Sequence, residues 1–291
     1  MNLNFLTLIL NTWQFNVVAF LVTAVFFAQY YKLAVNGIKK DGVALVIFQL
    51  IGAVSILVLV PFFPMRFSND PKIYGLLFAA VIFYTLNDRI QATIRKNLEV
   101  SIYSILNQFS KVFLVLYGIF IFKQEAVPLK LLGGCLILLG SMFLFYRKGK
   151  FTFNKYVLLA IVAAFCVATG LVIDVDISTK FNLPIYIMLT LAFPALIIFI
   201  SEHFSCQEIF DEFMSIRQKY FLVTGISWGL MILFMIRALQ LGQIVFIAPL
   251  MAVSVFLNVV VAYFLHKEHD HFLRKISVAI IIILGVYLIV T

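Results

Sequence analysis

Charge is scarce in this sequence of 291 residues. Only 12% of the residues are charged, 64% are hydrophobic, and the mean hydropathy is +1.08. A soluble domain of this length would carry about twice as much charge. The scarcity excludes an ordinary soluble globular domain and predicts an all-α integral membrane protein.

Sequence motifs for catalysis and cofactor binding are also missing. The three cysteines, Cys135, Cys166 and Cys206, have no spacing typical of a metal or redox site. There is no glycine-rich phosphate loop and no nucleophile–base pair at a usable spacing. We therefore expect no enzyme activity, no cofactor and no ATP hydrolysis. Uphill movement of a solute would then need an ion gradient or an exchange of substrates.

One short string contains several residue types that bind zinc. It reads HKEHDH, from His266 to His271. The string lies in a short connector between the last two apolar runs, where solvated polar residues are common. We expect a surface loop there and no metal site.

Apolar runs that can cross a bilayer recur along the whole chain, and the short connectors between them carry most of the charge. We expect ten spans, at residues 16–35, 43–60, 73–94, 100–122, 129–146, 157–175, 183–200, 221–236, 244–265 and 276–290. The longest connector, 201–220, contains the string CQEIFDEFMSIRQ and predicts an amphipathic surface helix. The net charge of +9 suits basic loops beside anionic lipid headgroups, and we expect no nucleic-acid binding.

Lys111 is the most unusual polar residue in these runs. It lies near the centre of 100–122, about 16 Å from either end at the rise of a helix. An ammonium group at that depth is costly unless it faces a bundle interior, a water-filled cavity or a partner charge. The sequence thus predicts a polar cavity within the membrane.

The two halves of the chain resemble each other. Residues 104–125 read SILNQFSKVFLVLYGIFIFKQE and residues 247–268 read IAPLMAVSVFLNVVVAYFLHKE, and both end in a basic residue and a glutamate. Five spans per half is an odd number, so the second copy has to cross the membrane in the opposite direction. Inverted repeats are typical of secondary transporters, whose substrate sites lie between the repeats near mid-membrane. We predict two five-helix repeats, residues 13–146 and residues 153–290.

Two strings carry a resemblance to a known family. ALQLGQIVFIAPLMAVSVFLNVVVAYFLHKE resembles the eighth and ninth spans, and LLAIVAAFCVATGLVIDVDIS the sixth span, of EamA-like transporters in the drug/metabolite transporter superfamily. The resemblance covers nearly the whole chain and implies ten transmembrane helices. Its members and relatives carry amino acids, choline-like cations, nucleotide sugars and sugar phosphates, so it leaves the substrate open. The first half departs from the pattern, because Leu106 stands where a proline is usual. The tryptophan that the family has in the first and sixth spans is also missing.

Two successive spans carry polar residues at three- and four-residue steps, so each set shares one helix face. In the third span the set is Tyr84, Asn87, Asp88, Gln91 and Arg95, and in the fourth it is Tyr103, Asn107, Ser110 and Lys111. We interpret both faces as walls of a substrate cavity in which Lys111 binds an anionic group. The alternative is a structural ion pair, Asp88–Lys111 or Asp88–Arg89, that only joins the two helices.

The second half offers fewer polar candidates. Asp174 and Asp176 close the sixth span, either as caps at the membrane interface or, for Asp174, as a carboxylate that binds a proton or cation. Trp228 could line the cavity or simply pack, and Asn258 could line it or bond to a neighbouring helix. The predicted substrate-binding residues are Tyr84, Asp88, Gln91, Tyr103, Asn107, Lys111, Trp228 and Asn258, and the predicted coupling residues are Asp88 and Asp174.

Basic residues are distributed unevenly between the two sides of the predicted membrane domain. Six lie on the side of the termini and fourteen on the other, with Lys111 and Arg89 left out as intramembrane and Arg237 counted as an anchor. The positive-inside rule then places both termini outside. Relatives in the resembled superfamily often have their termini in the cytoplasm.

Composition, repeat and resemblance together predict a secondary transporter of a small polar metabolite, amino-acid-like or anionic, that works by alternating access. Its expected partners are the substrate, membrane lipids and a proton or counter-substrate, and it would act as a monomer or homodimer in a bacterial cytoplasmic membrane. Two alternatives remain open. A lipid or lipid-linked-sugar flippase would need a lateral opening and an apolar groove, and a membrane scaffold would not transport at all.

Overall fold

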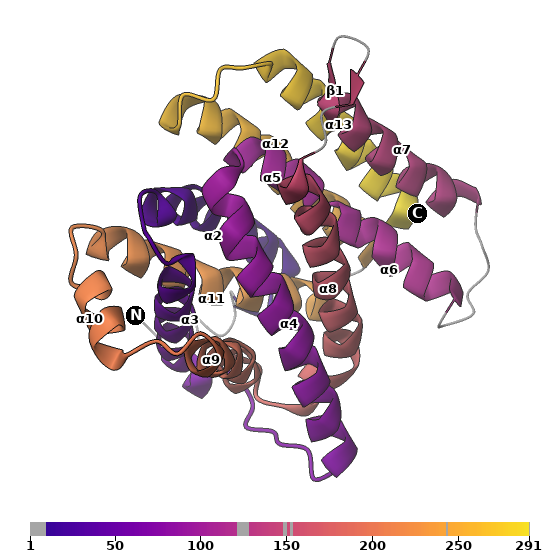
Figure 1. The fold of residues 1–291 in the computed structure, drawn as a ribbon. Helices are drawn as coiled ribbons and strands as arrows, with labels where there is room; N and C mark the ends of the chain where they lie inside the picture. Colours follow the sequence, from indigo (N-terminus) through magenta and orange to yellow (C-terminus); the bar gives the residue numbers. More distant parts are fainter. Residues whose placement is uncertain (1–9, 121–127, 148–149, 152–153, 243, 291) are drawn as a thin grey trace.

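The structure is a computed structural model that describes residues 10–120, 128–147, 150–151, 154–242 and 244–290. The side chains of Lys111 and Asp176 lie outside the described part. The fold is built of helices, with one pair of two-residue strands (Figure 1). The elements are α2 (Trp13–Val35), α3 (Asp41–Leu57), η1 (Val60–Phe62), α4 (Pro71–Asn97), α5 (Val100–Leu106), α6 (Phe109–Phe120), α7 (Pro128–Phe145), β1 (Tyr146–Arg147), β2 (Lys150–Phe151), α8 (Lys155–Ile177), η2 (Ser178–Lys180), α9 (Leu183–Ser201), α10 (Cys206–Phe213), α11 (Gln218–Leu241), α12 (Ile244–Leu265) and α13 (Phe272–Val290).

Among the described residues, five helices are long and apolar enough to cross a membrane. They are Trp13–Val35, Pro71–Asn97, Lys155–Asp174, Leu183–Ser201 and Gln218–Leu241, and two shorter apolar helices accompany them at Asp41–Leu57 and Leu250–Leu265. Large apolar side chains stand exposed on the outer faces of these helices, among them Val54, Phe78 and Leu158, each more than 60% exposed. Such a surface is unfavourable in water and suits contact with lipid. The prediction of an all-helical fold is confirmed, with several apolar helices that could span a membrane.

Several of these helices begin where the sequence supplies a capping side chain. Asp70 accepts a hydrogen bond from the backbone N–H of Lys72 (2.9 Å) at the start of α4. Asn154 caps α8 in the same way. Asn182 caps α9, and its side-chain amide also donates to the carbonyl of Phe63 (3.1 Å), which joins the start of α9 to the residue after η1.

The connector between α9 and α11 contains the short surface helix α10, as the sequence predicted. The Ser205 hydroxyl accepts from the backbone N–H of Glu208 (3.1 Å), and the Glu208 carboxylate accepts from the backbone N–H of Ser205 (3.0 Å). This reciprocal pair is a capping box. Lys40 forms an ion pair with Glu208, and the hydrogen bond from its ammonium lowers the pKa of that exposed carboxyl. Phe210 and Met214 stay exposed on the other face of the connector.

Nine of the ten predicted apolar runs each coincide with one helix, but the fourth does not. The continuous helix expected over 100–122 is instead two helices, α5 and α6. At the break the Ser110 N–H donates to the Asn107 carbonyl (3.2 Å), three residues back rather than four. The Ser110 hydroxyl donates to the same carbonyl (2.8 Å), in competition with the helical ladder. The fourth predicted span is thus interrupted next to Asn107, where two hydrogen bonds from Ser110 meet at one carbonyl.

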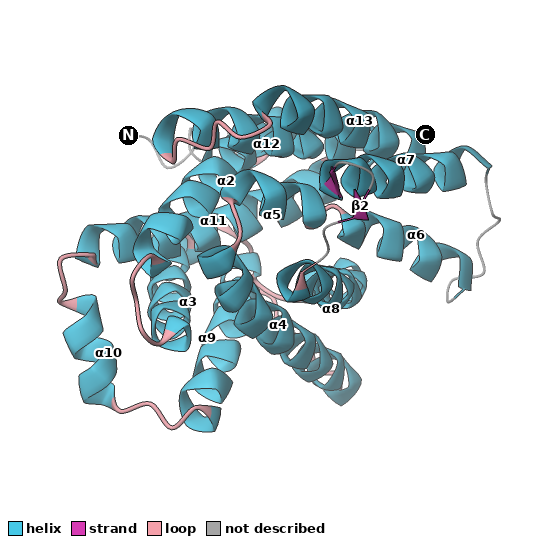
Figure 2. Cartoon of the chain, turned by 45° about the horizontal axis from the view of Figure 1, so that its top comes forward, coloured by secondary structure: helices cyan, strands magenta, loops and turns pink. Residues whose placement is uncertain are grey.

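The helices pack mainly in pairs that join the first half of the chain to the second. Helix α2 packs along α11, α4 along α8, α3 against α9, and α7 against α13. Figures 1 and 2 show α7 beside α13 at one edge of the molecule and α10 at the opposite edge. One hydrophobic cluster lies mainly among α2, α3, α9 and α11, and a second mainly among α5, α8, α12 and α13. The two halves thus share their cores.

Backbone meets backbone where α3 crosses α11. A Cβ atom added at Gly229 would lie 2.8 Å from the carbonyl oxygen of Gly52, and one added at Gly52 would lie 3.0 Å from the carbonyl oxygen of Gly225. Small residues four apart on one helix allow this close approach in membranes. The crossing admits no side chain on either helix at these positions.

Acidic and basic side chains tie the start of α5 to the loop before α13. Glu268 accepts hydrogen bonds from the backbone N–H groups of Val100 (2.9 Å) and Ser101 (3.3 Å), so it caps α5 from the other half of the chain. Lys275, only 3% exposed, forms ion pairs with Glu99 and with Glu268, the latter at 3.7 Å. In the string HKEHDH, Glu268 therefore has structural partners at the start of α5.

Hydrogen bonds from Lys32 hold the C-terminal end of α4, on the same side of the molecule. The ammonium group of Lys32, on α2, donates to the backbone carbonyls of Arg95 (2.9 Å), Lys96 (2.9 Å) and Leu98 (2.8 Å). These carbonyls are among those that a helix leaves unbonded at its end. Lys32 thus holds the last turn of α4 against α2.

Candidate functional site

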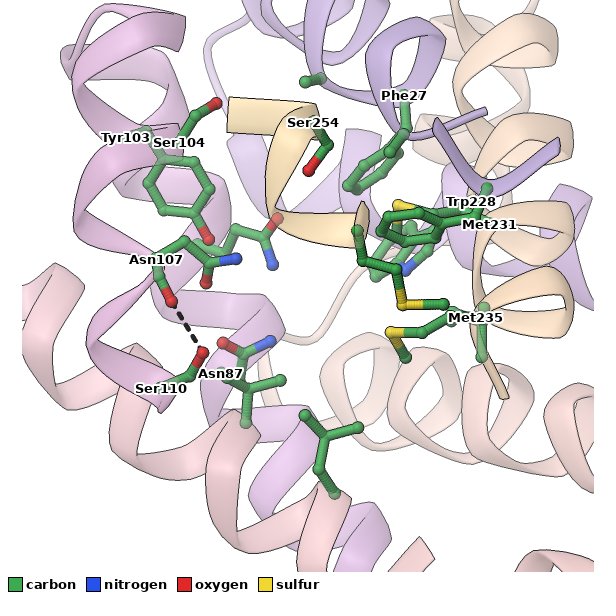
Figure 3. Close-up of a pocket in the computed structure, with 18 of the residues that line it drawn as sticks. Phe27, Asn87, Tyr103, Ser104, Asn107, Ser110, Trp228, Met231, Met235 and Ser254 are labelled. Atoms are coloured by element: carbon green, nitrogen blue, oxygen red, sulfur yellow. Dashed lines mark hydrogen bonds between the residues drawn. The ribbon is translucent and has the colours of Figure 1, made fainter. Parts of the chain in front are cut away.

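A cavity of about 210 Å³ lies among the helices of both halves. Its volume falls below the range of about 300–1,000 Å³ typical of drug-sized ligands, so it suits a small metabolite. Figure 3 shows part of its lining. The polar lining residues are Tyr84, Asn87, Asp88, Gln91, Arg95, Tyr103, Ser104, Asn107, Gln108, Ser110, Asp174, Thr190, Ser254 and Asn258.

Seven of the eight predicted substrate-binding residues line this cavity: Tyr84, Asp88, Gln91, Tyr103, Asn107, Trp228 and Asn258. Both predicted coupling residues, Asp88 and Asp174, line it as well. Lys111 lies in α6, and its side chain is outside the described part of the structure. The polar faces predicted on the third and fourth spans therefore meet around one space, and their roles in binding and coupling stay predictions.

Asp88 is buried and held by two amides. Gln49 donates to one carboxylate oxygen (2.8 Å) and Asn87 to the other (2.8 Å). Arg89, its neighbour on α4, instead forms ion pairs with Glu202 and with Asp41 (3.5 Å). The alternative of an Asp88–Arg89 pair is wrong, because the two side chains leave the helix in different directions and only Asp88 faces the cavity.

Asp174 forms a second buried carboxylate site. It accepts hydrogen bonds from the hydroxyls of Tyr84 (2.5 Å) and Tyr186. Asp174 is only 6% exposed and lines the cavity, and its two interpretations, an interfacial cap or a proton-binding carboxylate, stay predictions. Tyr186 was not foreseen from the sequence, because it stands as a single polar side chain in an apolar run and belongs to no periodic stripe.

Arg95 lies near the end of its apolar run in the sequence, yet it is only 8% exposed and lines the cavity. Its guanidinium carbon lies 4.3 Å from the ring centre of Tyr103, 4.7 Å from that of Phe27 and 4.9 Å from that of Tyr31. Its Nε donates to Gln91 (2.6 Å). The four-residue step from Gln91 was the signal that placed it on the polar face.

Trp228 and Asn258, the two substrate-binding residues predicted in the second half, lie where α2 meets the cavity. Trp228 packs on Phe27, with ring centres 5.1 Å apart, while lining the cavity. Asn258 accepts a hydrogen bond from Gln29 through its side-chain oxygen (3.0 Å) and another through its backbone carbonyl (3.2 Å). The alternatives for both residues are therefore not exclusive, since each packs or bonds to α2 and also faces the cavity.

The cavity has two unlike walls. Helices α4 and α5 and the turn after α5 supply amides and hydroxyls, seen in Figure 3 at Asn87, Tyr103 and Asn107. Helix α11 supplies the opposite wall, with Trp228, Met231 and Met235. Thioether and aromatic groups adapt well to apolar surfaces of varied shape. The arrangement can hold a molecule that is polar at one side and apolar at the other.

Metal binding finds no support in the described residues. They contain no group of three or more His, Cys, Asp or Glu side chains placed to hold an ion. In the string HKEHDH, His269 packs on Tyr263, with ring centres 4.5 Å apart. This contact gives the loop a packing role.

Comparison with known proteins bears on the fold. No protein-family model matches the chain, and no curated protein matches it. Among solved structures, 23 chains match. One of them, a crystal structure of a protein, covers 94% of this chain and 96% of its own at 12% sequence identity, with a TM-score of 0.54. At that identity the likeness shows that the two chains share a fold.

Proposed function

We propose that this protein is a secondary transporter that moves a small polar metabolite across the membrane by alternating access. One observation carries the proposal. The cavity among the apolar helices is lined from both halves of the chain and contains three buried ionisable side chains, Asp88, Arg95 and Asp174. Such groups are expensive within a membrane and mark solute pathways in membrane proteins.

The interrupted fourth span supports the same proposal. The break between α5 and α6 lies at Asn107, which lines the cavity together with Ser104 and Ser110. Irregular backbone at membrane depth is tolerated where it borders a cavity. Discontinuous helices of this kind form the substrate sites of many secondary transporters.

We further propose that residues 13–146 and 153–290 form two inverted repeats of five spans, as in the EamA-like transporters that the sequence resembles. The packing pairs support it. We count α5 and α6 as one span, leave α10 out, and number the remaining helices in chain order. In a five-span repeat, two spans that pack together should have equivalents, five places along the chain, that also pack together. The α2–α11 pair has the equivalent α8–α4, the α2–α12 pair has the equivalent α8–α6, and the pairs α3–α9 and α7–α13 are their own equivalents. A rocking motion of one half against the other would then open the cavity to either side.

The proposed site of action is a bacterial cytoplasmic membrane. The energy for uphill transport would come from a gradient or a counter-substrate, with Asp88 and Asp174 as the candidate proton carriers. Both carboxyls are buried and face the cavity, so a proton bound there could respond to the presence of substrate.

Purified protein in sealed vesicles tests the proposal. A thermal-shift screen of metabolites first identifies compounds that bind the folded protein, because such compounds raise its melting temperature. Labelled forms of these compounds should then enter protein-containing vesicles and not protein-free vesicles, and unlabelled compound inside should accelerate entry. If a compound binds the protein but does not enter the vesicles, with the protein inserted in either orientation, the alternative of a non-transporting membrane protein is supported. Movement of a labelled lipid between leaflets, with no solute uptake, would support the flippase alternative.

A further inference from the structure

We propose that Arg95 is the anchor for a carboxylate, and that the cavity takes a small organic monoanion with an apolar body. The carboxylate would bind at Arg95 and the body would lie against the wall formed by Trp228, Met231 and Met235. This inference rests on the proposed function in one respect: it takes the cavity to be the substrate site. It gives a binding role to Arg95, which the sequence placed on the polar face but not among the substrate-binding residues, and it narrows the expected polar metabolite to a monocarboxylate with an apolar body.

The first argument is the unbalanced charge of Arg95. The residue is 8% exposed, and no carboxylate oxygen of the described residues forms an ion pair with it. A guanidinium group has five N–H donors. Gln91 accepts a hydrogen bond from Nε (2.6 Å). A buried cation without a paired anion is unfavourable, so an anion from the cavity would be stabilising there.

The second argument is that the two carboxyls lining the cavity are already engaged elsewhere. Asp88 binds the amides of Gln49 and Asn87, and it lies seven residues from Arg95 on α4, about 10 Å along the helix. Asp174 binds two tyrosine hydroxyls. Neither carboxylate neutralises the guanidinium by direct contact, so the anion has to come from outside the described residues.

The third argument is the shape of the Arg95 environment. The rings of Phe27, Tyr31 and Tyr103 lie 4.3–4.9 Å from the guanidinium carbon and contact it through cation–π interactions. These contacts leave the edge of a planar guanidinium as the part able to form paired hydrogen bonds. A carboxylate matches that edge with two parallel N–H to oxygen bonds.

The fourth argument fixes the charge and the body of the ligand. Among the described lining residues Arg95 is the one Lys or Arg side chain, which favours a single negative charge over a phosphate dianion. The opposite wall is apolar, from Trp228 through Met235 to Met251. A cavity of about 210 Å³ leaves room for a short branched or single-ring body.

The first arm of the test uses the unmodified protein and four probes that share one apolar body. Phenylacetate, phenylacetamide, phenethylamine and methyl phenylacetate differ only in the group that would meet Arg95. Binding is measured by calorimetry and by thermal shift in detergent. Phenylacetate should bind at least about tenfold more tightly than the other three, because charge-assisted hydrogen bonds exceed neutral ones. Equal binding of the amide, tighter binding of the amine, or no binding of phenylacetate would overturn the proposal.

The second arm uses variants of the chain. Arg95→Gln should weaken phenylacetate binding about tenfold or more and leave phenylacetamide unchanged, whereas Arg95→Lys should keep part of the affinity because the charge remains but the planar fork is lost. Arg66→Gln, the same change at an exposed loop arginine, is the matched control and should bind as the unmodified protein does. Unchanged phenylacetate binding in Arg95→Gln would overturn the proposal. Since both arms measure binding, selective binding without vesicle uptake would refute transport and leave the carboxylate site standing.

Discussion

The glycine crossing of α3 and α11 gives the sharpest quantitative prediction. In Gly225→Ala the new Cβ would lie 2.6 Å from the Cβ of Ile51 and 2.8 Å from the carbonyl oxygen of Phe48. Neither atom can be moved by a side-chain rotation, because one is a Cβ and the other belongs to the backbone. The two helices have to separate, and overpacking of this kind costs about 1–3 kcal/mol of stability.

A matched control isolates that cost. Gly75, on the exposed part of α4, has no atom within 4 Å of an added Cβ. Gly75→Ala should therefore gain only the helix propensity of alanine, about 1 kcal/mol. The same propensity gain applies to Gly225→Ala, so the difference in unfolding free energy between the two variants equals the packing cost alone. We expect a difference of about 1–3 kcal/mol.

Unfolding of the purified variants in one detergent, followed by circular dichroism during heating and during titration with a denaturing detergent, measures this difference. The expected order of stability is Gly75→Ala above the unmodified protein, and Gly225→Ala below it. If the two variants unfold together, α3 and α11 are not in backbone contact at this point and the reasoning from the crossing fails.

Three further predictions concern charged residues. Asp88→Asn should flatten the pH dependence that we expect for uptake between about pH 5 and about pH 8, because an amide cannot carry a proton; a flat profile in the unmodified protein, with uptake only into preloaded vesicles, would instead show exchange. Lys111→Ala should abolish uptake at normal expression and Lys111→Arg should restore it only in part, because a planar fork does not replace a compact ammonium; normal uptake by Lys111→Ala would make the residue structural. Lys275→Met should lower the unfolding free energy by about 3–5 kcal/mol, since it leaves Glu99 and Glu268 without their buried cation; an unchanged midpoint in thermal unfolding would contradict this.

Patterns with a clear period were sufficient to predict the helices and one wall of the cavity. Apolar runs located the helical segments, and the three- and four-residue steps from Tyr84 to Arg95 located one lining face. Both signals depend on local geometry, because neighbours on a helix face are fixed by the number of residues per turn. The capping box of α10 at Ser205 and Glu208 is local in the same sense.

Features that depend on contacts between distant segments were missed. Gln49 lies in α3, 39 residues before the Asp88 that it binds, and no periodic pattern links the two. The ring contacts of Arg95 were missed for the same reason, because Phe27 and Tyr31 lie on α2, far from Arg95 in the sequence. The break between α5 and α6 was missed because a continuous apolar run does not show where backbone hydrogen bonds change from four-residue to three-residue steps, as they do at Ser110.

Arg95 lies where α2, α4 and α5 meet, and its contacts bear on the leakage of small ions through the protein. Its guanidinium contacts rings from α2 and α5, while Lys32 holds the carbonyl end of the same turn of α4. If the cavity is the substrate site, these contacts would hold the three helices together on the side of the basic loops while the site is empty. An anion that attracts the guanidinium toward the cavity would weaken the ring contacts and so loosen the three helices only when the site is occupied. Small ions would then be excluded by the same residue that admits the substrate.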